Sequence, residues 1–180
     1  LSKNRMPKQF LDVLGTGKSF IRSTFERFRP LVPVENFLVV TSESYKELVL
    51  SHLPELRPEQ VLAEPVRRNT APCIAYAARR IAAENPEADM VVTPADHLIT
   101  GEAEFQRIVR EGLGFVSGSD KLMTIGIKPS RPETGYGYIQ VDASPRSETA
   151  GTEICKVKTF TEKPNVEMAR VFVESGEFFW

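Results

Sequence analysis

"NFLVVTSESYKELVLSHL", residues 36–53, joins a continuous apolar run to an amphipathic helical pattern. An apolar run without polar alternation is typical of a strand that is buried on both faces, as in a parallel sheet. Parallel strands need a crossover connection, which is usually a helix, and a helical pattern follows this run. The stretch therefore predicts an α/β fold.

The same alternation of strand and helix patterns continues outward from this stretch. We expect further strands at 60–64, 89–93 and 121–127, and helices at 19–28, 70–84, 102–116 and 165–176. This order favours a mostly parallel sheet flanked by helices. Two later extended segments, 137–142 and 153–163, have no helix between them and predict a mixed or antiparallel addition. The polar segment 143–152 predicts an exposed loop.

Composition excludes several classes of protein. The chain has 180 residues with a net charge of −1, so no global basic field attracts nucleic acid or an acidic membrane. No apolar stretch reaches the roughly 20 residues of a membrane span, and no signal peptide is visible. Cys73 and Cys155 lack CxxC spacing, which gives no zinc site and no disulfide framework. We therefore expect a cytoplasmic protein.

Polar residues follow four of the predicted strands, where an α/β sheet binds its ligands. They are Glu64, Asp96 in "PADH" (94–97), the segment 128–138, and the pair Glu162 and Lys163 in "TEKP" (161–164). Asp96 is the best metal candidate, because Mg²⁺ takes one or two carboxylates together with phosphate oxygens and waters. The alternative for Asp96 is a turn-capping aspartate.

The other motifs each have two interpretations. "RRNTAP" (67–72) opens a helix, and Asn69 and Thr70 either bind a flat polar ligand edge or form an ordinary N-cap. Gly137 in "TGYGYI" (134–139) either lets the backbone approach a ligand or forms a tight turn. Glu162 and Lys163 either hold sugar hydroxyls and a phosphate or form an exposed pair.

Lys8 lies between a proline and a glutamine in "PKQF" (7–10). A rigid loop that aims one cation suggests a phosphate site, whereas the alternative is an incidental surface lysine. "GTGKS" (15–19) lacks the upstream glycine spacing of a Walker A motif. The chain also has no GxGxxG motif, so a dinucleotide-dependent oxidoreductase has no support. We interpret 15–19 as a turn into a helix that Ser19 caps.

Five motifs together resemble the sugar-1-phosphate nucleotidyltransferases and, within them, the mannose-1-phosphate guanylyltransferases. They are "LSKNRMPKQF" (1–10), "EPVRRNTAP" (64–72), "PADH" (94–97), "GIKPSRPETGYGYI" (126–139) and "FTEKP" (160–164). They occur in the family's order and cover nearly the whole chain. The resemblance implies a Rossmann-like fold with a mixed, mostly parallel central sheet.

The resemblance also implies a reaction and its partners. Mannose 1-phosphate attacks the α-phosphate of GTP, giving GDP-mannose and pyrophosphate, with Mg²⁺ as the cofactor. It implies no nucleic-acid or membrane partner and allows a homo-oligomer. The alternatives are transfer to another hexose 1-phosphate from UTP, dTTP or CTP, and a non-catalytic regulatory subunit.

Site residues are carried over motif by motif. Lys8 resembles the catalytic cation at the nucleotide phosphates, and Asp96 resembles the metal ligand. The resemblance implies a base-binding role for Glu64, Asn69 and Thr70. It implies a sugar-phosphate role for Gly137, Glu162 and Lys163. Lys3 and Arg5 are secondary phosphate candidates.

The family pattern also extends beyond both ends of this sequence. A first strand and a glycine-rich triphosphate loop precede the first motif, and a further sugar contact and a second metal carboxylate follow the last. We therefore expect 1–180 to form a single nucleotidyltransferase domain that is incomplete at both ends. We also expect the edge of one sheet to gather Lys8, Asp96 and Lys163.

Overall fold

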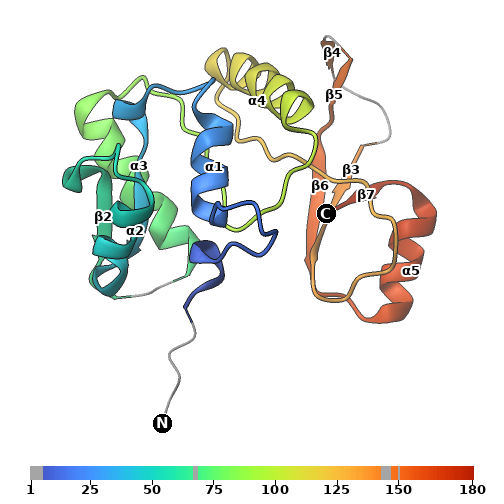
Figure 1. Ribbon diagram of the computed structural model, residues 1–180. Helices are drawn as coiled ribbons and strands as arrows, with labels where there is room; N and C mark the ends of the chain where they lie inside the picture. The colour runs from blue at the N-terminus through green and yellow to red at the C-terminus, as the bar shows by residue number, and fades with distance from the viewer. Residues whose placement is uncertain (1–5, 67–68, 143–146, 150) are drawn as a thin grey trace. The chain divides into compact units, whose positions relative to one another are not determined.

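A computed structural model describes residues 6–66, 69–142, 147–149 and 151–180 (Figure 1). The chain divides into two compact units, Leu1–Leu113 and Gly114–Trp180, and each is described by itself. Lys3 and Arg5, the secondary phosphate candidates, lie outside the described residues. No helix in the described ranges is both long and apolar enough to cross a membrane.

The first unit contains a pair of parallel strands joined by a helix. β1 (Val39–Ser42) pairs with β2 (Val61–Glu64) in parallel, and α2 (Lys46–His52) lies in the connection between them. The predicted strand–helix–strand order is therefore confirmed here. The other helices described in this unit are η1 (Lys8–Phe10), α1 (Phe20–Phe28), η2 (Val34–Asn36), η3 (Glu43–Tyr45), η4 (Pro58–Gln60), α3 (Thr70–Glu84) and α4 (Glu102–Ser117). The last residues of α4, from Gly114 on, belong to the second unit.

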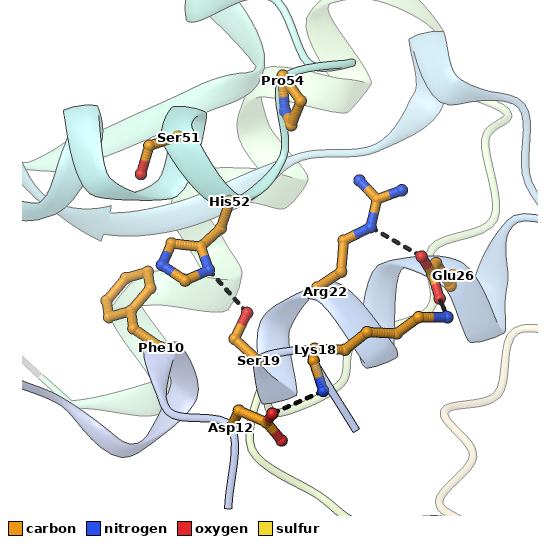
Figure 2. A pocket seen from close by; sticks show the side chains of 10 residues that line it. Phe10, Asp12, Lys18, Ser19, Arg22, Glu26, Ser51, His52 and Pro54 are labelled. Atoms are coloured by element: carbon orange, nitrogen blue, oxygen red, sulfur yellow. Dashed lines mark hydrogen bonds and ion pairs between the residues drawn. The ribbon is translucent and has the colours of Figure 1, made fainter. Parts of the chain in front are cut away.

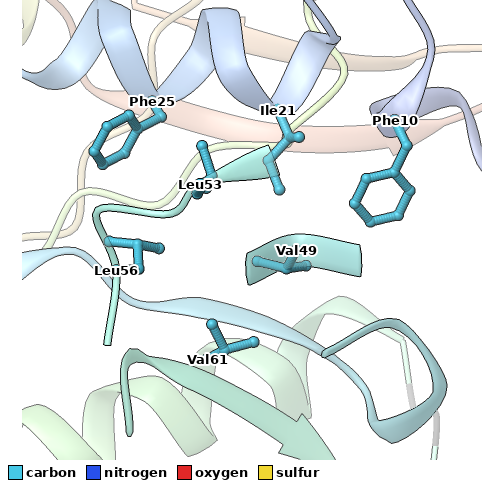
Figure 3. Packing of buried hydrophobic residues seen from close by; sticks show 7 residues of the cluster. All are labelled: Phe10, Ile21, Phe25, Val49, Leu53, Leu56 and Val61. Atoms are coloured by element: carbon cyan, nitrogen blue, oxygen red, sulfur yellow. The ribbon is translucent and has the colours of Figure 1, made fainter. Parts of the chain in front are cut away.

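One hydrophobic cluster holds the first unit together (Figure 3). Ile21 and Phe25 of α1 face the α2 segment, where Val49 and Leu53 are each only 1% exposed. The remaining members of the cluster are Phe10, Leu56 and Val61. Helix α1 is amphipathic, so burial of its apolar face, rather than helix propensity alone, stabilises it.

The second unit is built on an antiparallel sheet. β3 (Gly137–Val141) lies between β6 (Val157–Glu162) and β7 (Phe178–Phe179) and is antiparallel to both. The buried residues Tyr138 and Phe178 of this sheet share a small core with Ala169 of α5 (Val166–Ser175). The predicted late antiparallel pair is therefore confirmed, and the α/β class is confirmed for the chain.

Helix α5 begins and ends as its sequence predicts. Asn165 accepts a hydrogen bond from the backbone N–H of Met168 at 2.8 Å, as a capping side chain should. Gly176 ends the helix with φ of 72°, a left-handed conformation that glycine adopts without a steric penalty. At α1, Ser19 stands at the predicted N-cap position, but its side chain does not cap the helix. The Ser19 hydroxyl makes no capping bond and lies 2.8 Å from His52 Nδ1.

Three predictions of local structure are wrong for the described residues. Segments 89–93 and 121–127 form no β-ladder in those ranges, although both are apolar. A strand is stabilised by hydrogen bonds to a neighbour, and the one backbone pairing of these segments within the described ranges joins Ile127 to Trp180. The expected loop 143–152 instead contains part of a hairpin, because β4 (Ser147–Thr149) pairs with β5 (Thr152–Ile154).

Shortening a core side chain should destabilise the first unit. Because Leu53 is almost fully buried, we expect Leu53→Ala to lower the free energy of unfolding by about 2–5 kcal/mol. Leu14 is 53% exposed, so Leu14→Ala should change it by less than about 0.5 kcal/mol. Urea denaturation of the two variants tests this, and equal midpoints would contradict the assignment of the core.

Candidate active site

Lys8 lies on a rigid turn. Pro7 is extended, with φ of −57° and ψ of 146°, and its carbonyl accepts the backbone N–H of Phe10 at 3.0 Å. The Phe10 ring is buried against His52, with 5.3 Å between the ring centroids. The Lys8 side chain is exposed and has no ion pair within the described residues. Within the described residues, the turn therefore presents an unpaired cation.

A cavity of about 530 Å³ lies beside this turn (Figure 2). Its cations are already paired. Lys18 lies 2.6 Å from Glu26, and Arg22 lies 2.8 Å from Glu26 and 2.7 Å from Glu55. Charges neutralised in this way attract an added anion less strongly, so the unpaired Lys8 is the better phosphate candidate.

Asp96 is exposed in the segment 94–97. Its carboxylate makes no hydrogen bond or ion pair within the described ranges, so the alternative role as a turn-capping aspartate is not observed there. The residue before it, Ala95, packs against the hydrophobic cluster of the first unit. A fixed backbone therefore carries a carboxylate that has no partner among the described residues.

The free Asp96 carboxylate suits one kind of metal. Among the residues that the structure describes, no group of three or more His, Cys, Asp or Glu side chains could hold a metal ion. A cage made entirely of these residues is therefore absent. Mg²⁺ binds through one or two carboxylates and completes its shell with phosphate oxygens and waters, so Asp96 fits that mode.

Glu64 ends β2 next to a second cavity. The residue is half-buried, pairs in register with Ser42 of β1, and lines a space of about 320 Å³ with Pro72 and Tyr76 of α3. Burial raises the pKa of the neighbouring Cys73 thiol, and the Glu64 carboxylate raises it further. A carboxylate thus lies near the start of α3, where the sequence analysis considered binding of a flat polar edge of a ligand.

Asn69 holds a strained backbone in front of α3. Its φ of 67° and ψ of −165° lie in a region that almost only glycine occupies. The residue stands at the N-cap position, but its side chain makes no capping hydrogen bond, so the ordinary N-cap is not observed. Thr70 follows as the first helical residue, and both side chains are exposed.

Gly137 and Glu162 are brought together by the antiparallel sheet of the second unit. They are register partners in the β3–β6 ladder. A Cβ atom added to Gly137 would lie 3.6 Å from Glu162 Oε1, which is ordinary van der Waals contact. The glycine therefore leaves one side of the exposed carboxylate uncovered, so the ladder explains why these two predicted residues meet.

Lys163 follows Glu162 with another unusual backbone. Its φ is 44°, and its N–H donates to the Tyr136 carbonyl at 3.1 Å. The two charged side chains are exposed and form no ion pair with each other, so the predicted alternative of a neighbouring pair is not observed. Lys163 and Asn69 are the only non-glycine residues with positive φ in the described part of the chain.

Tyr138 supports the glycine-containing turn and was not predicted from the sequence. Its fully buried hydroxyl donates to the Glu133 carbonyl and accepts the Glu133 N–H, each at 2.9 Å. The Gly135 N–H, and then the Arg131 guanidinium, lower the pKa of the Glu133 carboxyl. These contacts fix the turn that leads to Gly137. The spaced tyrosines of "TGYGYI" were the signal available in the sequence.

Thr24 and Arg27 of α1 were also missed. Both side chains are buried, and both donate to backbone carbonyls of the Asp96 segment. The helical pattern of 19–28 identified the apolar face of α1. It did not indicate that a threonine and an arginine would be buried beside that face.

The comparisons with known proteins agree with these motifs. The family described as Nucleotidyl transferase matches residues 1–180. The chain belongs to the nucleotidyl transferase family. The family resemblance drawn from the five motifs is therefore confirmed.

Curated relatives carry related names. The chain is 38% identical over 182 residues to the xanthan biosynthesis protein XanB of Xanthomonas campestris pv. campestris (strain B100). It is 38% identical over 188 residues to the mannose-1-phosphate guanylyltransferase of Escherichia coli (strain K12). The matches cover all of this chain but only 37% and 38% of those two relatives. This member of the nucleotidyl transferase family thus spans less than half of their length.

Solved structures support the fold class of the family. A structure described as mannose-1-phosphate geranyltransferase from Thermus thermophilus gives a TM-score of 0.81 at 28% identity, covering 100% of this chain and 50% of that one. A structure described as mannose-6-phosphate isomerase from Helicobacter pylori gives 0.75 at 30% identity, covering 96% and 63%. The predicted nucleotide-sugar transferase fold is therefore confirmed.

Relieving the strained backbone at Asn69 should stabilise the fold. Release of strain of about 1–3 kcal/mol outweighs the entropy cost of glycine, about 0.5–1 kcal/mol. We expect Asn69→Gly to raise the free energy of unfolding by roughly 1 kcal/mol.

Asn85, at the other end of α3, provides the matched control. Its φ of −146° is ordinary, and its side chain accepts the Glu87 N–H at 3.1 Å. Asn85→Gly should therefore lower the free energy of unfolding. Thermal melts of both variants are the measurements. Equal changes in stability would show that Asn69 carries no special strain.

Proposed function

We propose that this chain forms part of an enzyme that transfers GMP from GTP to mannose 1-phosphate, giving GDP-mannose and pyrophosphate. One observation carries the proposal. The two non-glycine residues with positive φ in the described ranges, Asn69 and Lys163, lie in separate motifs, one expected to bind the nucleotide and one the sugar phosphate. Strained backbone of this kind is concentrated at functional sites.

The proposed reaction is a displacement at phosphorus. A phosphate oxygen of mannose 1-phosphate forms a new bond to the α-phosphorus of GTP. The bond from that phosphorus to the bridging oxygen breaks, and pyrophosphate leaves with the electron pair. Such chemistry depends on positioning and on neutralisation of charge rather than on covalent help from the protein.

Lys8 is the proposed neutralising cation. Its rigid turn, and an ammonium without an ion pair among the described residues, suit a group that must meet the negative charge of the phosphates. Asp96 is the proposed ligand of Mg²⁺. When bound, that ion would withdraw charge from the phosphate oxygens. The Asp96 carboxylate would hold the ion, and it has no other side-chain partner within the described ranges that would compete.

The base side of the proposed site lies at the start of α3. Guanine presents an N2 amino donor with the neighbouring N1–H on one edge, and a half-buried carboxylate such as Glu64 can accept both. The Asn69 amide and the Thr70 hydroxyl supply further polar groups to the same ligand. This donor pattern favours guanine over uracil, thymine and cytosine, which lack two adjacent ring-edge donors of this kind.

The sugar side of the proposed site lies on the β3–β6 ladder. Glu162 accepts hydrogen bonds from sugar hydroxyls, and Gly137 leaves room for the sugar beside the carboxylate. Lys163 pairs with the sugar phosphate as a point charge. We propose a cytoplasmic location because both substrates are cytoplasmic metabolites. An assembly of several copies stays a prediction.

A nucleotide panel tests the choice of substrate. The full-length protein that carries this chain should form a nucleotide sugar from mannose 1-phosphate with GTP at least about 10-fold faster than with UTP, dTTP or CTP, in line with about 1–3 kcal/mol for a bidentate base contact. Chromatography of the products gives the rates. A preference for UTP or dTTP would favour the alternative hexose enzyme, and no product with any nucleotide would favour the regulatory subunit.

Removal of the Lys8 ammonium tests the catalytic role. We expect Lys8→Ala in the full-length protein to lower kcat by about 100-fold or more, because the cation stabilises charge that develops in the transition state. Lys18 is ion-paired with Glu26, so Lys18→Ala should keep kcat within a few-fold of the wild type. An unchanged kcat for Lys8→Ala would remove the assignment.

A further inference from the structure

Arg27 is a buried cation in the middle of the first unit. It is 3% exposed, whereas a charged side chain is costly to bury unless it is paired. Its ion-pair partner, Glu102 at the start of α4, lies 3.5 Å from Nε and is itself 52% exposed in its side chain. The Arg27 guanidinium also lies over the Phe105 ring, 5.9 Å from its centroid.

One donor of Arg27 reaches the Asp96 segment, and Nη1 donates to the Thr24 hydroxyl at 3.5 Å. Nη2 donates to the His97 carbonyl at 3.4 Å. One helical turn earlier, the buried Thr24 hydroxyl donates to the Ala95 carbonyl, also at 3.4 Å. The two side chains are three residues apart, so they lie on one face of α1. They therefore bind the carbonyls on both sides of Asp96.

These contacts hold the backbone and leave the carboxylate free. Within the described ranges Asp96 makes no side-chain hydrogen bond or ion pair, although both of its neighbours are bound through their carbonyls. A contact to the carboxylate would have competed with a metal ion. A contact to the flanking carbonyls limits rotation of the segment without that competition.

We propose that Thr24 and Arg27 are positioning residues that aim the Asp96 carboxylate at Mg²⁺. The inference rests on the proposed role of Asp96. The stability of the fold does not require an arginine at this position, because replacing a buried ion pair by apolar side chains often leaves the stability unchanged or raises it. Groups of this kind, one contact removed from the metal, typically change its affinity by about 10–100-fold.

Direct metal binding tests the proposal. Mn²⁺ replaces Mg²⁺ as an EPR probe, and it is titrated into the full-length protein with a non-reacting α,β-methylene analogue of GTP. We expect Thr24→Val to weaken Mn²⁺ binding by about 10-fold, because the variant keeps the volume and loses the donor. Thr24→Ser keeps the hydroxyl and should bind Mn²⁺ like the wild type.

Arg27→Lys is the second variant, since it keeps the charge and loses the forked donor set. It should also weaken Mn²⁺ binding by about 10-fold. Arg22→Lys is its matched control on the same helix, where the arginine pairs with Glu26 and Glu55 and has no bond to the Asp96 segment. We expect wild-type Mn²⁺ affinity for that control.

The outcomes separate this inference from the proposed function. Wild-type Mn²⁺ affinity in both Thr24→Val and Arg27→Lys, with a lower melting temperature, would overturn the positioning role and leave a structural one. Asp96→Asn serves as the reference. If it leaves Mn²⁺ affinity unchanged, the role of Asp96 fails and the positioning role fails with it. Loss of affinity in Asp96→Asn alone would overturn only the inference.

Discussion

The first unit depends on the packing of one hydrophobic cluster. Phe10 lies two residues after Lys8, Val61 lies three residues before Glu64, and Ala95 directly precedes Asp96, and all three apolar side chains belong to or pack against this cluster. Burial of their apolar surface therefore also fixes the backbone next to Lys8, Glu64 and Asp96. A change in the core would move charges that are themselves exposed, because close-packed interiors transmit displacements rather than absorb them.

Two positions of the backbone run against local preference. Asn69 and Lys163 hold conformations that cost of order 1–3 kcal/mol each, and they persist because neighbouring contacts over-determine them. Helix α3 begins directly after Asn69, and the Lys163 N–H is bound to the Tyr136 carbonyl. Within the described ranges neither side chain makes a hydrogen bond or an ion pair, so both are available for the ligand contacts proposed for them.

The sequence predicted helices better than strands, and for a physical reason. The pattern at 70–84 gave both bounds of α3, and Asn165 and Gly176 marked the ends of α5, because periodicity and caps are local properties. Segments 89–93 and 121–127 have the composition of strands, but a ladder requires a partner that local pattern cannot identify. The candidate site shows the same limit. Sequence motifs identified candidate residues such as Gly137 and Glu162. They did not identify Thr24, Arg27 and Tyr138, whose contacts depend on how the chain folds.

The supporting contacts in both units have a common form. Tyr138 binds the backbone of Glu133, and Thr24 and Arg27 bind the backbone carbonyls beside Asp96, so support reaches the turns through main-chain atoms. A side-chain charge that is already paired inside the protein has little attraction left for a phosphate or a metal ion. Lys8 and Lys163 likewise make no ion pair within the described ranges. Rigid backbone combined with unpaired charge is what electrostatic preorganisation requires, because the charges are held in place before a ligand arrives and need no partner to be displaced.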